Sequence, residues 1–128
     1  MISLIGPINS GSATGGAGAA TSTGISGSVL RGYLIGAHIK YNDSPPATTD
    51  ITICTQGTSP RPPTYNLIVV SNNATDGWYY PRTTVHDIAG AAVSSTYDYL
   101  PLFDYVQVII AQANNSDNVD VWLLVESG

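Results

Sequence analysis

Charged side chains are scarce in this chain. They make up 10% of its 128 residues, and four Lys and Arg against nine Asp and Glu leave a formal net charge of −5. Binding to nucleic acid requires clusters of Lys and Arg that displace the counterions of phosphates, and anionic membranes attract the same clusters. We therefore expect no nucleic acid and no membrane as partner. So few charges also predict a surface that a protein partner largely covers.

Cysteine is scarce as well, and long apolar runs are missing. Cys54 is the one cysteine, so no disulfide can form within the chain. No His or basic residue stands near it in the sequence, which favours a small strand residue over a nucleophile. The apolar runs are a few residues long, against the ~20 that span a bilayer. The N-terminus lacks the basic and apolar regions of a signal peptide, so we expect synthesis and use in a cytoplasm or a virion.

No motif indicates catalysis. His86 and Asp87 could join one of the serines in a triad, but the nucleophile-elbow pattern Gly-x-Ser-x-Gly is missing. His38, His86 and one cysteine do not supply the closely spaced pairs of a zinc site. The Asn-rich run 114–118 offers oxygens to calcium, but it lacks the Gly and final Glu of an EF-hand, and a polar hairpin turn explains it. We predict a non-enzymatic protein with no catalytic residue, no cofactor and no metal site.

The chain does contain short apolar or alternating apolar and polar runs, which turn residues separate. With 13 Gly and 8 Pro as punctuation, the runs 28–41, 50–56, 65–71, 100–113 and 119–126 have the pattern of strands. No stretch has the apolar period of an amphipathic helix. This predicts an all-β fold, an antiparallel β-sandwich of the jelly-roll type. We expect the run 65–71 in the centre of a sheet and the last two runs paired as a hairpin.

The same alternation predicts the core, because residues of one phase of a strand share one face of its sheet. The expected core residues are Val29 or Leu30, Ile35, Ile39, Ile51, Ile53, Leu67, Val69, Val106, Val108, Ile110, Val121 and Leu123. His38 falls in the opposite phase of its strand, so we expect it on a partly exposed face.

The stretch 75–82 contains the densest group of aromatic residues. Asp76-Gly77 is a strong turn signal, and the three aromatic residues that follow favour a half-buried strand. Pro81 removes a backbone donor, which places this strand at an edge or bend of the sheet. We interpret the stretch as a closing corner of the sandwich.

The N-terminal residues 1–18 differ from the rest. Apolar residues at Ile2, Leu4, Ile5 and Ile8 precede a Gly/Ser-rich segment, Asn9–Gly18, whose composition is that of a flexible linker. Either the segment is a loose tail, or it tethers the four apolar side chains to a neighbouring subunit. We predict two parts, an extended N-terminal arm (1–18) with these four residues as a partner-binding set, and a β-sandwich domain (19–128).

Several phrases carry a resemblance to a known class of proteins. They are 44–53 (SPPATTDITI), 76–82 (DGWYYPR), 87–92 (DIAGAA) and 111–122 (AQANNSDNVDVW). In order and spacing they resemble small β-rich virion proteins of tailed bacteriophages, most of all head decoration (cement) proteins. The resemblance covers roughly residues 27–126, and the loop Ser59–Pro63 and Cys54 depart from it.

The resemblance implies a structural role. It suggests a protein made in the cytoplasm of a host bacterium and placed on the virion capsid surface, where it binds the major capsid protein and stabilises the assembled head. It also suggests a homotrimer at local three-fold positions. Exposed strand edges with few guarding charges favour such closed association.

An alternative is a tail- or spike-associated sandwich that binds a receptor or glycan. Trp78, Tyr79, Tyr80 and Trp122 could form a flat stacking platform for sugars, although aromatic residues in strands usually pack in the core. The direction of these side chains separates the two hypotheses. An exposed coplanar set favours glycan binding, and a buried set favours a scaffold.

Overall fold

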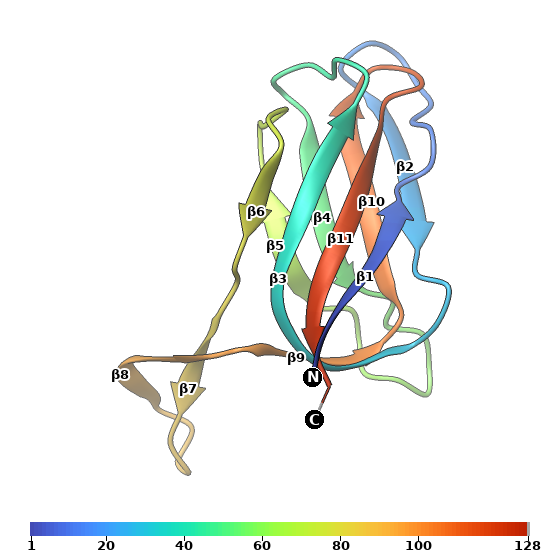
Figure 1. The fold of residues 1–128 in the computed structure, drawn as a ribbon. Coiled ribbons are helices and arrows are strands. Elements are labelled where there is room, and N and C mark those ends of the chain that lie inside the picture. The colour runs from blue at the N-terminus through green and yellow to red at the C-terminus, as the bar shows by residue number, and fades with distance from the viewer. Residues whose placement is uncertain (128) are drawn as a thin grey trace.

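The computed structural model describes residues 1–127, and every regular element in that range is a β-strand. Two antiparallel sheets face each other, and a two-stranded ribbon stands away from them (Figure 1). No helix in the described range is long and apolar enough to cross a membrane. The strands are β1 (Ile2–Asn9), β2 (Ala20–Ile25), β3 (Leu30–Asn42), β4 (Asp50–Thr55), β5 (Asn66–Val70), β6 (Gly77–Tyr79), β7 (Thr83–His86), β8 (Ala92–Asp98), β9 (Leu100–Asp104), β10 (Val106–Ala113) and β11 (Asn118–Glu126).

The front sheet has the order β1-β11-β3, and β3 is long enough to pair with two strands on its other side. Residues Leu30–Leu34 of β3 pair with β9, and Ala37–Ile39 pair with β6. The back sheet has the order β2-β10-β4-β5, and the ribbon consists of β7 and β8. The expected all-β antiparallel sandwich is confirmed, and the aromatic strand β6 lies at an edge, as Pro81 indicated.

The C-terminal connection differs from the prediction. The run 100–113 divides at Tyr105 into β9 in the front sheet and β10 in the back sheet, and β10 and β11 do not form the expected hairpin. A buried carboxylate fixes this crossing between the sheets. Asp104 accepts hydrogen bonds from the backbone N–H groups of Gly57 (2.9 Å) and Tyr105 (2.7 Å) and lies 3.4 Å from the Arg61 guanidinium. Alternation along a strand carries no signal for such a change of sheet.

The core fills the space between the two sheets. Most of the predicted residues are buried there, with Leu30 in place of Val29, but Ile35 is half-buried and Val69 is 55% exposed. A bulge opposite Leu124 and Val125 reverses the phase of β3, so Leu34 is buried before it and Ala37 and Ile39 after it. Val69 points outward because the register of β5 against β4 shifts at Leu67, so that Ile68 and Val70 face the core after the shift. The strand β5 also lies at the edge of its sheet and not in the centre, where its apolar run suggested it.

The N-terminal segment is extended, as expected, but it is part of the sandwich. Residues Ile2–Asn9 pair with β11 of the same molecule as strand β1. Ile8 and Ala13 lie in the core, at 6% and 0% exposure. The boundary that we predicted at residue 18 is therefore not visible, because the edge of β11 offers unpaired backbone groups that β1 satisfies.

Candidate functional site

The outer surface of the front sheet carries a row of aromatic side chains. His38 on β3 lies opposite Trp78 on β6 and Trp122 on β11 in the strand register. The His38 ring centroid lies 4.9 Å from that of Trp78 and 6.0 Å from that of Trp122. Side chains directly opposite one another share a face of the sheet, so the strand pairing itself builds the row.

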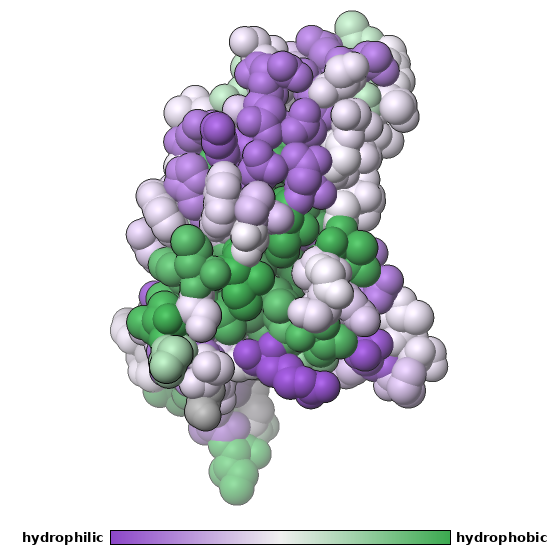
Figure 2. Space-filling view, turned by 45° about the vertical axis from the view of Figure 1, so that its right-hand side comes forward, coloured by the Kyte–Doolittle hydropathy of each residue, from purple (hydrophilic) through white to green (hydrophobic). Residues whose placement is uncertain are grey.

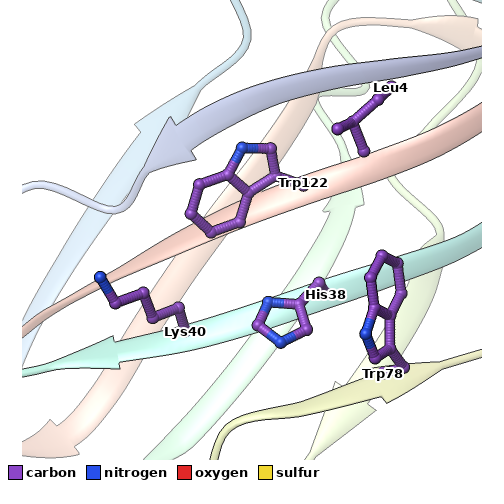
Figure 3. Close-up of a pocket in the computed structure, with 5 residues that line it drawn as sticks. All are labelled: Leu4, His38, Lys40, Trp78 and Trp122. Atoms are coloured by element: carbon purple, nitrogen blue, oxygen red, sulfur yellow. The ribbon is translucent and has the colours of Figure 1, made fainter.

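Leu4 and Lys40 complete a shallow pocket of about 300 Å³ around this row. Figure 3 shows the five side chains on one surface, with His38 between the two indoles and Leu4 and Lys40 at the rim. They come from four strands, β1, β11, β3 and β6. A pocket assembled in this way depends on the sheet and not on any one loop.

Tyr80 extends the row beyond β6. Its ring is nearly parallel to that of Trp78, with an interplanar angle of 10° and centroids 6.3 Å apart, and it is 58% exposed. Gly36 makes this position possible, because a Cβ there would lie 2.7 Å from the Tyr80 ring. Tyr79, between the two exposed rings in sequence, packs against the core. Trp78 and Tyr80 thus face outward, and Tyr79 does not belong to the platform.

On the opposite side of the row, Gly6 leaves room for Trp122, as Gly36 does for Tyr80. Its φ of +137° falls in the region that favours glycine, and a Cβ would lie 2.7 Å from the Val121 carbonyl oxygen and 3.3 Å from the Trp122 side chain. The absence of a side chain lets β1 pass close to Trp122 while the adjacent bulge between Ile5 and Ile8 shifts its register.

A polar network borders the aromatic row at its other end. The side-chain amides of Asn9 and Asn42 each donate to the Asp120 carboxylate, at 2.9 and 3.0 Å. Both also donate to Asn118 Oδ1, at 2.9 and 2.8 Å. These bonds hold the four side chains as one rigid group across β1, β11 and β3. The face therefore combines an apolar half with a fixed polar half.

The charge of Asp120 is stabilised within this network. The Asn9 hydrogen bond is the largest influence that lowers its pKa, and the Asn42 bond and the positive charge of Lys40 act in the same direction against partial burial. Lys40 and Asp120 are cross-strand neighbours. The ion pairs within residues 1–127 join Met1 to Glu126 and Arg61 to Asp104. Lys40 is in neither pair, so its ammonium group can contact a ligand.

The four N-terminal residues expected to bind a partner are not equivalent. Ile2 and Leu4 are 58% and 61% exposed, Ile5 is half-buried against the core, and Ile8 is buried. Ile8 is therefore unavailable to a partner, because it faces the core beside Val121, its neighbour in the register. Leu4 has a place that the sequence did not indicate, at the rim of the pocket.

Two residues that raised the possibility of catalysis have structural roles here. The Asp87 carboxylate accepts hydrogen bonds from the backbone N–H groups of Ala89 (2.9 Å) and Ala91 (3.0 Å), as a turn-forming Asp does. Cys54 is buried, and burial raises the pKa of its thiol, which disfavours the reactive thiolate.

Sequence reasoning found the two tryptophans and Tyr80 but not His38, Lys40 or Leu4 as members of one site. His38 and Lys40 occupy alternate positions of one strand, which is a signal that they share a face. Their alignment with Trp122 and Asp120 depends on the pairing of β3 with β11, which joins residues 84 and 80 positions apart in the chain.

Comparison with known proteins shows the fold. No protein-family model and no curated protein matches this sequence. Two point variants of CBM29-2, a family 29 carbohydrate-binding module, match the structure with a TM-score of 0.51 and 14% sequence identity. The matches cover 99% and 98% of this chain and 91% of each module. At this identity the likeness is one of fold, and it confirms the jelly-roll type of sandwich.

Proposed function

We propose that the protein is a non-catalytic binding module that holds a glycan against the outer surface of its front sheet. The observation that carries this proposal is the exposed row Trp78–His38–Trp122. Trp78 is 50% exposed and Trp122 is half-buried, and both line the pocket. An exposed coplanar set of aromatic residues was the condition that favoured glycan binding over a scaffold. The row faces outward, and Trp78 and Tyr80 are nearly parallel at 10°, but the His38 ring is tilted by 60° and 54° from the two indoles.

The physical basis is the match between a sugar ring and an indole. A pyranose has an apolar face of C–H groups that packs on the electron-rich face of an aromatic ring, while its hydroxyl groups need polar partners. Trp78 and Trp122 are two strands apart, which corresponds to about 10 Å, a distance comparable with a disaccharide unit in an extended chain. Lys40 and the Asp120 network lie where hydroxyl groups at the rim would meet them. The family 29 modules that share this fold are carbohydrate-binding modules, which supports the proposal.

Intrinsic fluorescence offers a direct test, because both tryptophans of the chain lie on this face. We expect titration with at least one class of soluble oligosaccharide, drawn from neutral β-linked and uronic acid chains, to change the emission. Calorimetry should show that Trp78→Ala and Trp122→Ala each weaken binding at least about tenfold, or 1.4 kcal/mol. Tyr97→Ala, an exposed aromatic residue on the ribbon, is the matched control and should bind as the wild type does. Folded protein that binds no member of a broad glycan array would overturn the proposal.

A second candidate is the head decoration role that the sequence resemblance suggests, with the major capsid protein as partner. One observation favours it over a solitary module. The ribbon β7–β8 projects from the sandwich, and every residue of β8 is exposed. Its test is the stability of phage heads with and without the protein. Heads that lack it should lose DNA at lower temperature, and unchanged heads with the protein located in the tail would exclude this role.

A further inference from the structure

The ribbon formed by β7 and β8 has few contacts with the rest of the molecule. The two strands pair only with each other (Figure 1). All seven residues of β8 are exposed. At the turn Ile88 is fully exposed, and Tyr97 is 64% exposed. A two-stranded ribbon alone is marginally stable in water, so contact with a partner surface would stabilise this one.

Two contacts of Arg82 attach the base of the ribbon to the sandwich. The Arg82 guanidinium lies 4.3 Å from the centroid of the Tyr99 ring and donates to the Ile35 carbonyl oxygen at 2.9 Å. Arg82 precedes β7 and Tyr99 follows β8, so this cation–π contact clamps the two ends of the ribbon together at the sandwich.

A second uncovered surface lies at the opposite edge of the front sheet. Strand β1 pairs with β11 on one side, and no other strand pairs with residues Ile2–Ile5 in the described range. Ile2 and Leu4 are exposed beside this free edge. Figure 2, which turns this side of the molecule forward, shows apolar side chains gathered over its lower half. An exposed apolar patch next to an unpaired strand edge marks an interaction surface.

The two surfaces match in charge. The segment Ile2–Ile5 contains no charged side chain. The ribbon has two, Asp87 at its turn and Asp98 at the end of β8, and each already accepts hydrogen bonds from backbone N–H groups next to it. The one charge at the edge, the N-terminal ammonium of Met1, is paired with Glu126 at 3.1 Å. Contact through the uncharged stretch Ile88–Tyr97 and Ile2–Ile5 therefore avoids burying an unpaired charge, which is the main cost that opposes such contacts.

We propose that the ribbon of one copy of this protein docks on the N-terminal half of β1 of a second copy. The ribbon extends from the β6 side of the front sheet and β1 forms the opposite edge (Figure 1). The contact therefore joins two different surfaces head-to-tail, and a rotation between copies can close it into a ring. A stable interface buries about 800 Å² on each partner, from roughly 20 to 30 residues. The eleven strand residues of the ribbon and its turn supply most of one side. On the other side, Ile2–Ile5 and the apolar patch next to them (Figure 2) supply the receiving surface. The proposal does not depend on the binding of glycans.

Single charges placed on each surface test the contact. Sedimentation velocity of the full chain over a wide range of concentrations should show self-association for the wild type. Ile88→Asp and Ile2→Asp should each weaken it at least tenfold. Val69→Asp, an exposed position on the edge strand of the back sheet, is the matched control and should associate as the wild type does. Because all three side chains are exposed, the melting temperature of each variant should stay near that of the wild type.

Mixing the variants distinguishes a head-to-tail contact from a symmetric one. The Ile88→Asp chain keeps its β1 edge and the Ile2→Asp chain keeps its ribbon, so an equimolar mixture should form a one-to-one complex that neither variant forms alone. A wild type that stays monomeric at every concentration would overturn the proposal. Association that Ile88→Asp abolishes and Ile2→Asp leaves intact would overturn it too, because ribbon would then pair with ribbon.

Discussion

Two buried serines join the ends of the outer strands to the starts of inner strands. Ser10 follows β1, and its N–H donates to the Val119 carbonyl oxygen at 3.1 Å while its Oγ accepts the Val119 N–H at 3.1 Å. Ser26 follows β2 and makes the same two bonds with Val106, at 2.9 and 3.1 Å. Each serine thus continues a strand pairing for one more residue, once in each sheet.

Replacing either serine with alanine should destabilise the protein by about 1–3 kcal/mol. The valine N–H groups belong to residues with 0% exposure, so water cannot replace the lost hydroxyl without rearrangement. The cost of leaving a buried donor unpaired sets this range. For a domain of this size it corresponds to a fall of roughly 3–15 °C in melting temperature. Because the serines lie in different sheets and share no partner, the double variant should lose nearly the sum.

Urea denaturation followed by tryptophan fluorescence measures the free energy of unfolding, and circular dichroism gives the melting temperature. Ser28→Ala is the matched control, since Ser28 is exposed and contributes only its backbone carbonyl oxygen, which accepts from Ser26 Oγ. It should change stability by less than about 0.5 kcal/mol. Ser10→Ala and Ser26→Ala variants that unfold like the control would refute the reasoning, because the hydroxyl bonds would then add nothing.

Three further predictions concern the core, the N-terminus and pH. Leu34→Ala should cost about 2–5 kcal/mol and Ile35→Ala clearly less in urea denaturation; equal losses would show that the bulge in β3 is misplaced. Deletion of residues 1–18 should lower the melting temperature strongly, since it removes the buried Ile8 and uncovers β11; an unchanged melting curve would mean that the segment is dispensable. The folded state lowers the pKa of Asp120, so its contribution to stability is present above the unfolded pKa and is lost as pH falls through the folded one. Asp120→Asn should flatten the loss of stability in acid, and an unaltered profile would show that the carboxylate does not contribute.

The aromatic face shows which part of the site could be predicted from the sequence. Trp78 and Trp122 were recognisable as candidates because tryptophan is rare and both lie in strands. The sequence left open whether they face the core or solvent. In a strand this choice depends on register, and a shift of one residue reverses it. The structure resolves it through the pairing of His38 with both indoles.

The core predictions that were wrong have one kind of cause. Ile35 and Val69 share the apolar phase that the sequence suggests, yet register shifts in β3 and in β5 turn both side chains away from the core. Both shifts depend on how each strand pairs with its neighbour in the sheet. The N-terminal arm was misjudged for the same reason, since a Gly/Ser-rich segment looks like a tether until β11 is known to pair with the residues before it.

The sequence by itself determined the local properties of this protein. Alternating apolar residues, Pro and Gly turns and the lack of helical periodicity are enough for an all-β sandwich, because they follow from the backbone geometry of single strands. Only the tertiary structure decided which strands pair, where β3 bulges, that Tyr105 marks a change of sheet, and that Leu4, His38, Lys40 and the two tryptophans share one surface. Those features depend on hydrogen bonds between residues far apart in the chain, and their stability comes from the packing of whole sheets, which no single strand contains.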